Sequence, residues 1–291
     1  MPKMRRANRA FTLVELLIVC GIIAILAGIM IPVVSKVRAS AYRADTANQI
    51  SVLQGAINQY YQNFQAYPGP YSDQDIYNGT AIKGEKVTMA ENLVLGLLGG
   101  AQVQRKGTKI SSIYNPDLVG TGPRSLDPVN PKAYEPFLSK FDGWLSNRTS
   151  PYVDSTGRSP CSDSNVPEFI DRYPSEPMPI LYLRARRGAS GIISDTSGKV
   201  FQYNLLQILP YTSATINGKQ QGLNQLGSLS DLLSSRNALP YFKDPTATQN
   251  QSINDQSQGV PRCKDGYILI SAGPDRIYGT ADDITSFGNL E

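Results

Sequence analysis

The sequence predicts an α+β protein in which one long N-terminal helix packs on a small antiparallel β-sheet domain. An apolar run continues into an amphipathic helical pattern over residues 11–65, and three short β-rich segments follow in the second half of the chain. The 291 residues are 41% hydrophobic and 18% charged, which suits one medium domain with an anchor or two small domains. This composition excludes a chain that is disordered throughout.

Residues 1–10 form a basic leader that contains no acidic residue. Four of the 28 basic residues lie in it, which leaves 24 basic against 24 acidic residues in the rest of the chain; the four are Lys3, Arg5, Arg6 and Arg9. Without the leader the side-chain charges balance, so the basic pI near 8.8 gives no indication that the protein binds nucleic acid.

Residues 11–34 are predicted to be the transmembrane half of the helix. Every residue from Leu16 to Ile31 is apolar or glycine, and counting from Leu13 the run is interrupted only by Glu15. About 19 residues at about 1.5 Å each span roughly 28 Å, close to the thickness of a bilayer's hydrocarbon core. A removable secretory signal peptide competes with this interpretation, but its apolar core is usually only about 7–15 residues.

Residues 35–66 are predicted to be an amphipathic half of the same helix, because apolar residues recur mostly in steps of three and four. The "AYPGP" segment ends it, since Pro68 and Pro70 cannot continue a helix. Pro32 lies between the two halves. It either loosens the helix as a hinge or marks where the span leaves the bilayer.

Glu15 is the unusual residue of the apolar run, since an ionised carboxylate in hydrocarbon costs a few kcal/mol or more without a partner. Near the interface it could reach the headgroups. A cleavage between Ala10 and Phe11 would offer another solution, because it creates an α-amino group four residues from Glu15. Two such chains side by side could pair amine with carboxylate, which would make Glu15 an assembly contact.

These residues resemble a known family. The segment "RAFTLVELLIVCGIIAILAGIMIPVV" is similar to the signal of type IV pilins and of type II secretion pseudopilins, and "QISVLQGAINQYYQNFQAYP" resembles the helix end of the major pseudopilin. The resemblance implies a pilin-like fold, removal of the leader by a prepilin peptidase between Ala10 and Phe11, and methylation of the new N-terminus. It also implies that Glu15 orders assembly and that Pro32 is the helix kink. The family usually has glycine where this chain has Ala10.

The function that this resemblance implies is a structural, non-enzymatic subunit of a periplasmic pseudopilus. Its expected partners are other copies in a filament, other pseudopilins and an inner-membrane assembly platform. A subunit of a type IV pilus is the close alternative, and a membrane-anchored enzyme or carbohydrate-binding protein is a more distant one. The chain has no histidine, which removes histidine triads and most catalytic zinc sites. A pair of acids among residues 73–91 would remain for hydrolysis.

Residues 67–291 are predicted to form the periplasmic α+β domain with long loops. A short helix is expected within residues 87–100, where Thr88 and Glu91 have capping-box spacing and Gly99 can end the helix. Residues 114–177 look rich in loops. Strands are expected within 179–187, 199–209 and 265–273. The first contains Arg184, Arg186 and Arg187, which form either a basic patch or, as we favour, a solvated strand face.

The tail after the last predicted strand is a candidate metal loop. Three carboxylates, of Asp275, Asp282 and Asp283, fall in one short segment that contains turn-forming glycines. Ca²⁺ takes about six to eight oxygen ligands from flexible loops of this kind, although the spacing is not that of an EF-hand. The major pseudopilin has a calcium-binding C-terminal loop of similar pattern. The resemblance implies Ca²⁺ ligand roles for Asp275 and Asp283, with Asp282 as a further candidate.

The chain has three cysteines, of which Cys20 lies in the apolar run. Cys161 and Cys263 are left as a possible disulfide in an oxidising compartment or as two free thiols.

Overall fold

The computed structural model describes residues 13–71, 88–106, 109–119, 136–138, 141, 143–146, 166–174, 176–188, 202–203, 215–216, 219–220, 242, 244 and 260–288. Its chain divides into two compact units, Met1–Tyr42 and Arg43–Glu291, which are described separately below. The leader, Phe11, Cys161 and most of the 73–91 segment lie outside the described residues.

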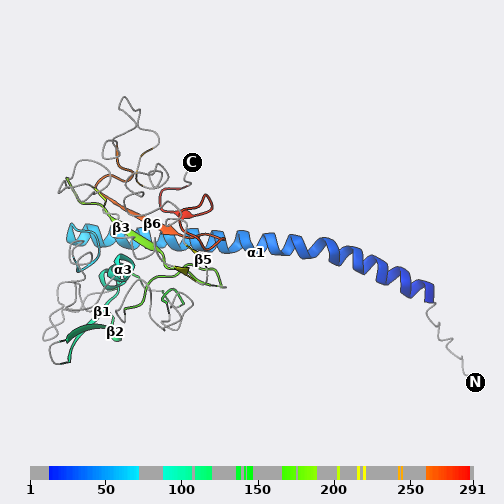
Figure 1. The fold of residues 1–291 in the computed structure, drawn as a ribbon, viewed down its shortest axis with the longest axis horizontal. Coiled ribbons are helices and arrows are strands. Elements are labelled where there is room, and N and C mark those ends of the chain that lie inside the picture. Colours follow the sequence, from blue (N-terminus) through cyan, green and yellow to red (C-terminus); the bar gives the residue numbers. More distant parts are fainter. Residues whose placement is uncertain are drawn as a thin grey trace, which may run out of the picture. The chain divides into compact units, whose positions relative to one another are not determined.

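Helix α1 runs without interruption from Leu13 to Phe64, which confirms the long helix predicted from the sequence (Figure 1). In the first unit every described residue except the half-buried Tyr42 is exposed. In the second unit the helix buries one face against its own domain, through Thr46, Gln49, Ile50, Leu53, Ala56, Ile57 and Tyr60. These positions recur every three or four residues, as the amphipathic pattern requires.

The chain leaves α1 through a tight turn at residues 65–71, in which Gln65 takes a left-handed φ of 53°. The Arg184 guanidinium donates to the carbonyl oxygens of Gly69 (3.2 Å) and Tyr71 (3.0 Å). Asn92 exchanges two hydrogen bonds of 3.1 Å with the backbone of Tyr71. A Cβ on Gly96 would lie 2.5 Å from the backbone nitrogen of Gly69, so the turn and the next helix meet at a position where only glycine fits.

That next helix, α3, spans Met89–Leu97 and is buried at every residue. The predicted capping box is present: the Thr88 hydroxyl accepts from the Glu91 N–H at 3.1 Å, and the Glu91 carboxylate accepts from the Thr88 N–H at 2.9 Å. Gly99 follows the helix with a positive φ of 74°, as expected for a residue that ends a helix. The local signals therefore predicted this element correctly.

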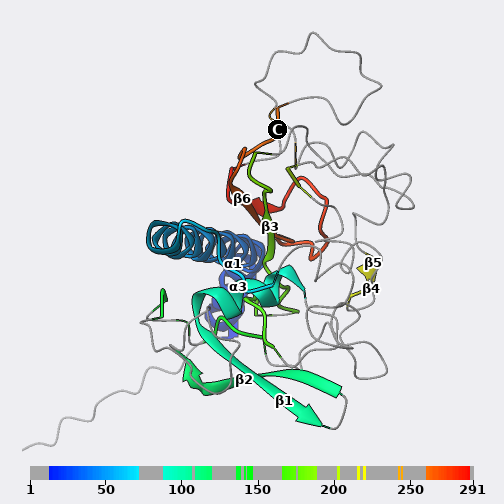
Figure 2. The same cartoon turned by 90° about the vertical axis from the view of Figure 1, so that its left-hand side faces the viewer.

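The main sheet is antiparallel with the order β3–β6–β7, from strands β3 (Leu181–Arg184), β6 (Tyr267–Ser271) and β7 (Ile284–Thr285). In its register Leu181 pairs with Ile270 and Arg184 with Tyr267. The Gln54 amide on α1 donates to the Ser286 carbonyl at 3.0 Å, which ties the helix to the end of the sheet. Figures 1 and 2 show β3 and β6 beside the C-terminal part of α1. An α+β fold with a long N-terminal helix and a small antiparallel sheet is thus confirmed.

Two further strand pairs lie outside this sheet. The hairpin of β1 (Gly99–Lys106) and β2 (Lys109–Val119) is antiparallel, and β4 (Thr215–Ile216) pairs with β5 (Lys219–Gln220). Strand β2 corrects the expectation that the loop-rich region begins at residue 114. Its sequence "KISSIYNPDLV" includes a proline and an Asn–Pro step, which favour turns over strands, so the local signal opposed the strand that pairing with β1 forms.

Two of the three predicted strands are confirmed as β3 and β6, whereas β7 was not predicted. From the segment 199–209 the structure describes Gln202 and Tyr203 alone, and Tyr203 forms a single bridge. The expectation of a solvated strand face fails at Arg184, whose guanidinium binds the carbonyls of the turn after α1. Arg186 and Arg187 are exposed, as expected.

Candidate functional site

The first unit presents an uncovered apolar helix surface. Large hydrophobic side chains from Leu13 to Val37 are between 44% and 79% exposed, and the helix is long and apolar enough to cross a membrane. Within this stretch Glu15 is exposed and lies in the first turn of α1, where the positive end of the helix dipole favours a carboxylate. Ala10 and Phe11, the predicted processing residues, lie outside the described residues.

Pro32 lies inside α1, and the helix continues through it. Proline has no N–H, so the carbonyl one turn earlier loses its usual donor at this position. The Ser35 hydroxyl donates to the Pro32 carbonyl at 2.9 Å, a local side-chain bond of the kind that accompanies helix bending. The role of Pro32 as a helix kink in a filament stays a prediction.

The second unit places the predicted metal residues on the loop that follows β6. The Asp275 carboxylate accepts from the Ile277 N–H at 2.8 Å, and the Asp282 carboxylate accepts from the Asp275 N–H at 3.1 Å. A Cβ on Gly273, whose φ is 60°, would lie 2.3 Å from the Asp282 carbonyl oxygen. The loop therefore closes on itself, with the segments around Asp275 and Asp282 side by side and glycine required between them.

Asp275 and Asp282 are brought together, whereas Asp283 has a different role. Burial raises the pKa of Asp275, and the neighbouring Asp282 carboxylate raises it further. Asp283 is only 2% exposed and accepts from the Gly279 N–H at 3.0 Å. Among the residues that the structure describes, no group of three or more acids, cysteines or histidines is placed so that it could hold a metal ion.

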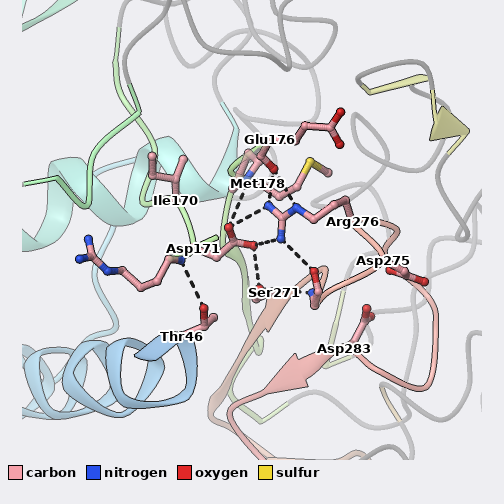
Figure 3. Close-up of polar contacts among 12 residues, drawn as sticks. Thr46, Ile170, Asp171, Glu176, Met178, Ser271, Asp275, Arg276 and Asp283 are labelled. Carbon is pink, nitrogen blue, oxygen red and sulfur yellow. Dashed lines mark hydrogen bonds and ion pairs between the residues drawn. The ribbon is translucent and has the colours of Figure 1, made fainter. Parts of the chain in front are cut away.

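The loop is anchored by a buried ion pair that the sequence did not reveal. Arg276 donates two hydrogen bonds to the Asp171 carboxylate, at 2.6 and 2.8 Å, and the two side chains are 5% and 0% exposed (Figure 3). Its remaining three N–H groups donate to backbone carbonyls, two to that of Glu176 (2.8 and 2.5 Å) and one to that of Gly273 (2.9 Å). All the N–H groups of the guanidinium thus have acceptors, which is the condition under which a buried charge is tolerated.

The Asp171 carboxylate is satisfied from several directions. Besides Arg276, it accepts from the Ser271 hydroxyl at 3.0 Å and from the Met178 N–H at 3.2 Å. Burial raises the pKa of Asp171, and the hydrogen bonds from Arg276 and its other donors act in the opposite direction. Arg276 has a left-handed φ of 64°, which is unfavourable for a residue other than glycine, so its ion pair also holds a strained backbone.

The two cysteines that the structure describes, Cys20 and Cys263, are exposed, and they form no disulfide with each other. Cys161 lies outside the described residues, so the pairing of Cys161 with Cys263 stays a prediction.

The N-terminal segment of the chain matches a family model, and part of the chain is similar to known proteins. Residues 5–31 match the family model described as the prokaryotic N-terminal methylation motif. The chain is similar to the fimbrial proteins of Neisseria meningitidis serogroup B and serogroup A, each 30% identical over 116 residues. Each match covers 37% of this chain and 66% of the relative, so the chain spans just under two thirds of the length of the relatives it matches. No solved structure matches the chain.

These similarities agree with the prediction, made from the sequence, of a prepilin-type N-terminus. The chain carries a prepilin-type methylation motif, is type IV pilin-like, and has near its N-terminus a helix suited to membrane anchoring.

Proposed function

We propose that this protein is a structural subunit of the periplasmic pseudopilus of a type II secretion system. In this proposal a prepilin peptidase removes residues 1–10, the new N-terminus at Phe11 is methylated, and α1 anchors the subunit in the inner membrane with the domain in the periplasm. The subunit then joins copies of itself and other pseudopilins through the inner-membrane assembly platform. The methylation motif over residues 5–31 supports the processing step.

One observation carries the assembly proposal: from Leu13 to Val34 the helix has no charged residue except Glu15, and its apolar side chains find no cover within their own unit. From Leu13 to Val37 it extends about 36 Å at 1.5 Å per residue, more than a bilayer's hydrocarbon core of about 30 Å. A helix that is hydrophobic all round is stable only in lipid or among other apolar helices. Both environments are available to a subunit that waits in a membrane and then enters a helical bundle.

Glu15 fits this exchange of environments. Among apolar helices its carboxylate needs a cationic partner, and the amine of a processed Phe11 on a neighbouring copy is a partner of matching charge. The pair would set the register between copies, because an unpaired charge in apolar surroundings is costly in every other register.

The exposed face of α1 in the second unit also suits packing against other copies. No charged residue occurs between Thr46 and Tyr71. The exposed positions of this stretch of helix instead carry small or amide side chains and one valine, namely Ala47, Asn48, Ser51, Val52, Gly55, Asn58, Gln59, Gln62 and Asn63. A solvated helix face is usually charged, whereas small residues let helices approach closely.

A subunit of a type IV pilus is the second candidate, favoured by the printed name of the similar Neisseria proteins, "Fimbrial protein". Mechanical shearing of cells separates the two: surface fibres are released, whereas a periplasmic filament stays with the cell envelope. We expect the protein in the envelope fraction and a loss of protein secretion when its gene is deleted. Recovery in the sheared fraction with secretion intact would favour the pilus.

An enzymatic role has little support from the acids considered for it. Of residues 73–91 the structure describes 88–91, in which Glu91 serves as the cap of α3. The similarity to fimbrial proteins also favours a structural subunit.

Processing is tested by intact-mass spectrometry of the full protein extracted from membranes. We expect a chain that begins at Phe11 and carries one extra methyl group. A chain that begins at Met1 would contradict the proposed function, and one that begins beyond residue 30 would show a removable signal peptide instead.

We further propose that the loop binds Ca²⁺, with Asp275 and Asp282 as carboxylate ligands and Asp283 supporting the loop through Gly279. The two neighbouring carboxylates repel each other when both are ionised, and a cation would supply the neutralising charge. The three aspartates do not form one cluster, so backbone carbonyls and water would have to complete the site. A chelator should lower the melting temperature of the detergent-solubilised protein, and Asp282→Asn should remove that sensitivity, whereas Asp265→Asn should not. An unchanged melting temperature in chelator would refute the calcium site.

A further inference from the structure

The first turn of α1 that the domain buries is held by polar side chains. In the second unit, residues 43–45 are exposed, and Thr46 is the first buried residue of the helix. Thr46 and Gln49 are 0% and 1% exposed, whereas the buried apolar residues of α1 begin at Ile50. Since residues 46–49 bury no apolar residue against the domain, their packing rests on the hydrogen bonds that these two polar side chains make.

Both of these side chains bind the same short segment, residues 170–172. The Gln49 amide donates to the Ile170 carbonyl at 2.8 Å, and the Arg172 N–H donates to the Thr46 hydroxyl at 3.2 Å. The side-chain carbonyl oxygen of Gln49 is buried and has no hydrogen-bond donor among the described residues. An unpaired buried acceptor is costly, so this turn of the helix is held less firmly than the apolar part that follows it.

Asp171, the middle residue of that segment, is bound from the loop after β6. Its carboxylate accepts from Arg276 at 2.6 and 2.8 Å, and Figure 3 shows it between this arginine and Thr46 of α1. The two planar peptide units that flank Asp171 carry the Ile170 carbonyl and the Arg172 N–H, the groups that hold the helix. A shift of Asp171 away from α1 by about 1 Å would therefore take both bonds beyond hydrogen-bond length.

We propose that the ion pair of Asp171 and Arg276 is a latch that sets how far the domain holds α1. With the pair intact, the hold begins at Thr46. When the pair is released, Thr46 and Gln49 lose their partners, and the hold begins at Ile50, the first buried apolar residue. About one turn of helix, roughly 6 Å, then leaves the domain while the core stays folded. The loop after β6 thus controls the free length of α1.

Thiol labelling of the full protein in detergent, with chelator present, tests the latch. In a background whose native cysteines are replaced by serine, the reporter is either Thr46→Cys, in the latched turn, or Ala56→Cys, at a position 4% exposed in the apolar part of the same helix. Thr46→Cys gives up one of the two holds, so Gln49 alone carries the latch there. Global unfolding exposes both reporters equally, whereas opening of the latch exposes the one at position 46.

Arg276→Met should raise the labelling rate at position 46 at least about tenfold more than the rate at position 56. Ser271→Ala removes a single bond to Asp171, of 3.0 Å, and should give an excess of about twofold, which keeps the test open if Arg276→Met does not fold. Lys219→Met, at an exposed cation beside the same loop, should give no excess. Equal acceleration at both positions, or none at either, would refute the latch.

Two glutamines of α1 provide a matched control without added cysteines. Gln49 and Gln54 each donate an amide to a backbone carbonyl, at 2.8 and 3.0 Å, but only the acceptor of Gln49 flanks Asp171. The effect of Gln49→Met on the unfolding equilibrium constant should differ at least about fivefold between the unaltered and the Arg276→Met backgrounds, whereas the effect of Gln54→Met should agree within about twofold. The same dependence on background for both glutamines would refute the latch. Neither experiment uses bound Ca²⁺ or filaments, so such a result would leave the proposed function standing.

Discussion

The first half of α1 and the loop after β6 differ in whether their side chains find partners within the chain. From Leu13 to Val37 the helix leaves its large apolar side chains uncovered. At the loop, by contrast, Arg276 and Asp171 are nearly inaccessible, and each of these two charged groups is matched by the other and by donors or acceptors of the same chain. The Arg276–Asp171 pair is therefore satisfied within the folded chain, whereas the helix surface requires lipid or other molecules. A single chain can therefore be stable as a subunit and still be committed to assembly.

The largest loss of folding stability should come from breaking the buried ion pair of Arg276 and Asp171. Arg276→Met leaves the Asp171 carboxylate buried without its counter-charge, so we expect the free energy of unfolding to fall by about 3–5 kcal/mol. Lys219→Met removes an ammonium from a pair that is 41% and 39% exposed, and the expected loss is below about 1 kcal/mol. Denaturant unfolding of the protein in detergent measures both. Equal losses would show that the buried pair has no special role.

A smaller effect is expected where the turn after α1 meets α3. Gly96→Ala would force a Cβ to within 2.5 Å of the Gly69 nitrogen, and relieving this overlap should cost about 1–3 kcal/mol. Gly55→Ala lies on the exposed face of α1 with no atom within 4 Å of the new Cβ. It should stabilise the protein by up to about 1 kcal/mol, because alanine favours helix. A shift of the same sign in both variants would contradict this packing.

The smallest expected effect is on the pH dependence of folding stability, to which Asp275 and Asp265 should contribute with opposite signs. The pKa of Asp275 is raised in the folded protein by burial and by Asp282, so folding is favoured while Asp275 is protonated and stability falls as pH rises above the ordinary carboxyl pKa of about 4. The pKa of Asp265 is lowered by hydrogen bonds from Gln202 and Gly188, so its contribution is present above that pKa and is lost as pH falls below it.

Unfolding of the Asp275→Asn and Asp265→Asn variants between pH 3 and 7, in the presence of chelator, measures the contribution of each carboxyl group to stability. Relative to the unaltered protein, Asp275→Asn should gain stability as pH rises and Asp265→Asn should lose it. Parallel pH profiles would mean that the two carboxylates have similar environments.

The sequence predicted those features whose signals are local. The apolar run, the capping box of Thr88 and Glu91, and the strands β3 and β6 each depend on neighbouring residues, and the structure has them. Strand β7 has two residues, too few for a periodicity. Of the candidate metal residues, the sequence placed all three on one loop but could not show that Asp283 turns to Gly279.

The features that were missed join residues far apart in the chain. Arg276 and Asp171 are separated by 105 positions, and the Gln49 amide donates to a carbonyl 121 positions away, that of Ile170. Arg184 was considered with its sequence neighbours as part of a strand face, whereas its partners are the carbonyls of residues 69 and 71. Nothing in the residues around an arginine distinguishes a solvated guanidinium from one that binds a distant turn.

In the proposed filament, other copies cover the exposed apolar surface of α1, and the Glu15 carboxylate sets their register by pairing with the processed N-terminus of a neighbouring copy. The direct test is the amount of filament formed in cells by Glu15→Gln, with Glu15→Asp as a variant that keeps the charge and with membrane levels of each subunit measured in parallel. We predict that Glu15→Gln is inserted and processed normally but forms little or no filament, and that Glu15→Asp retains part of the assembly. Normal filament growth by Glu15→Gln would contradict the account.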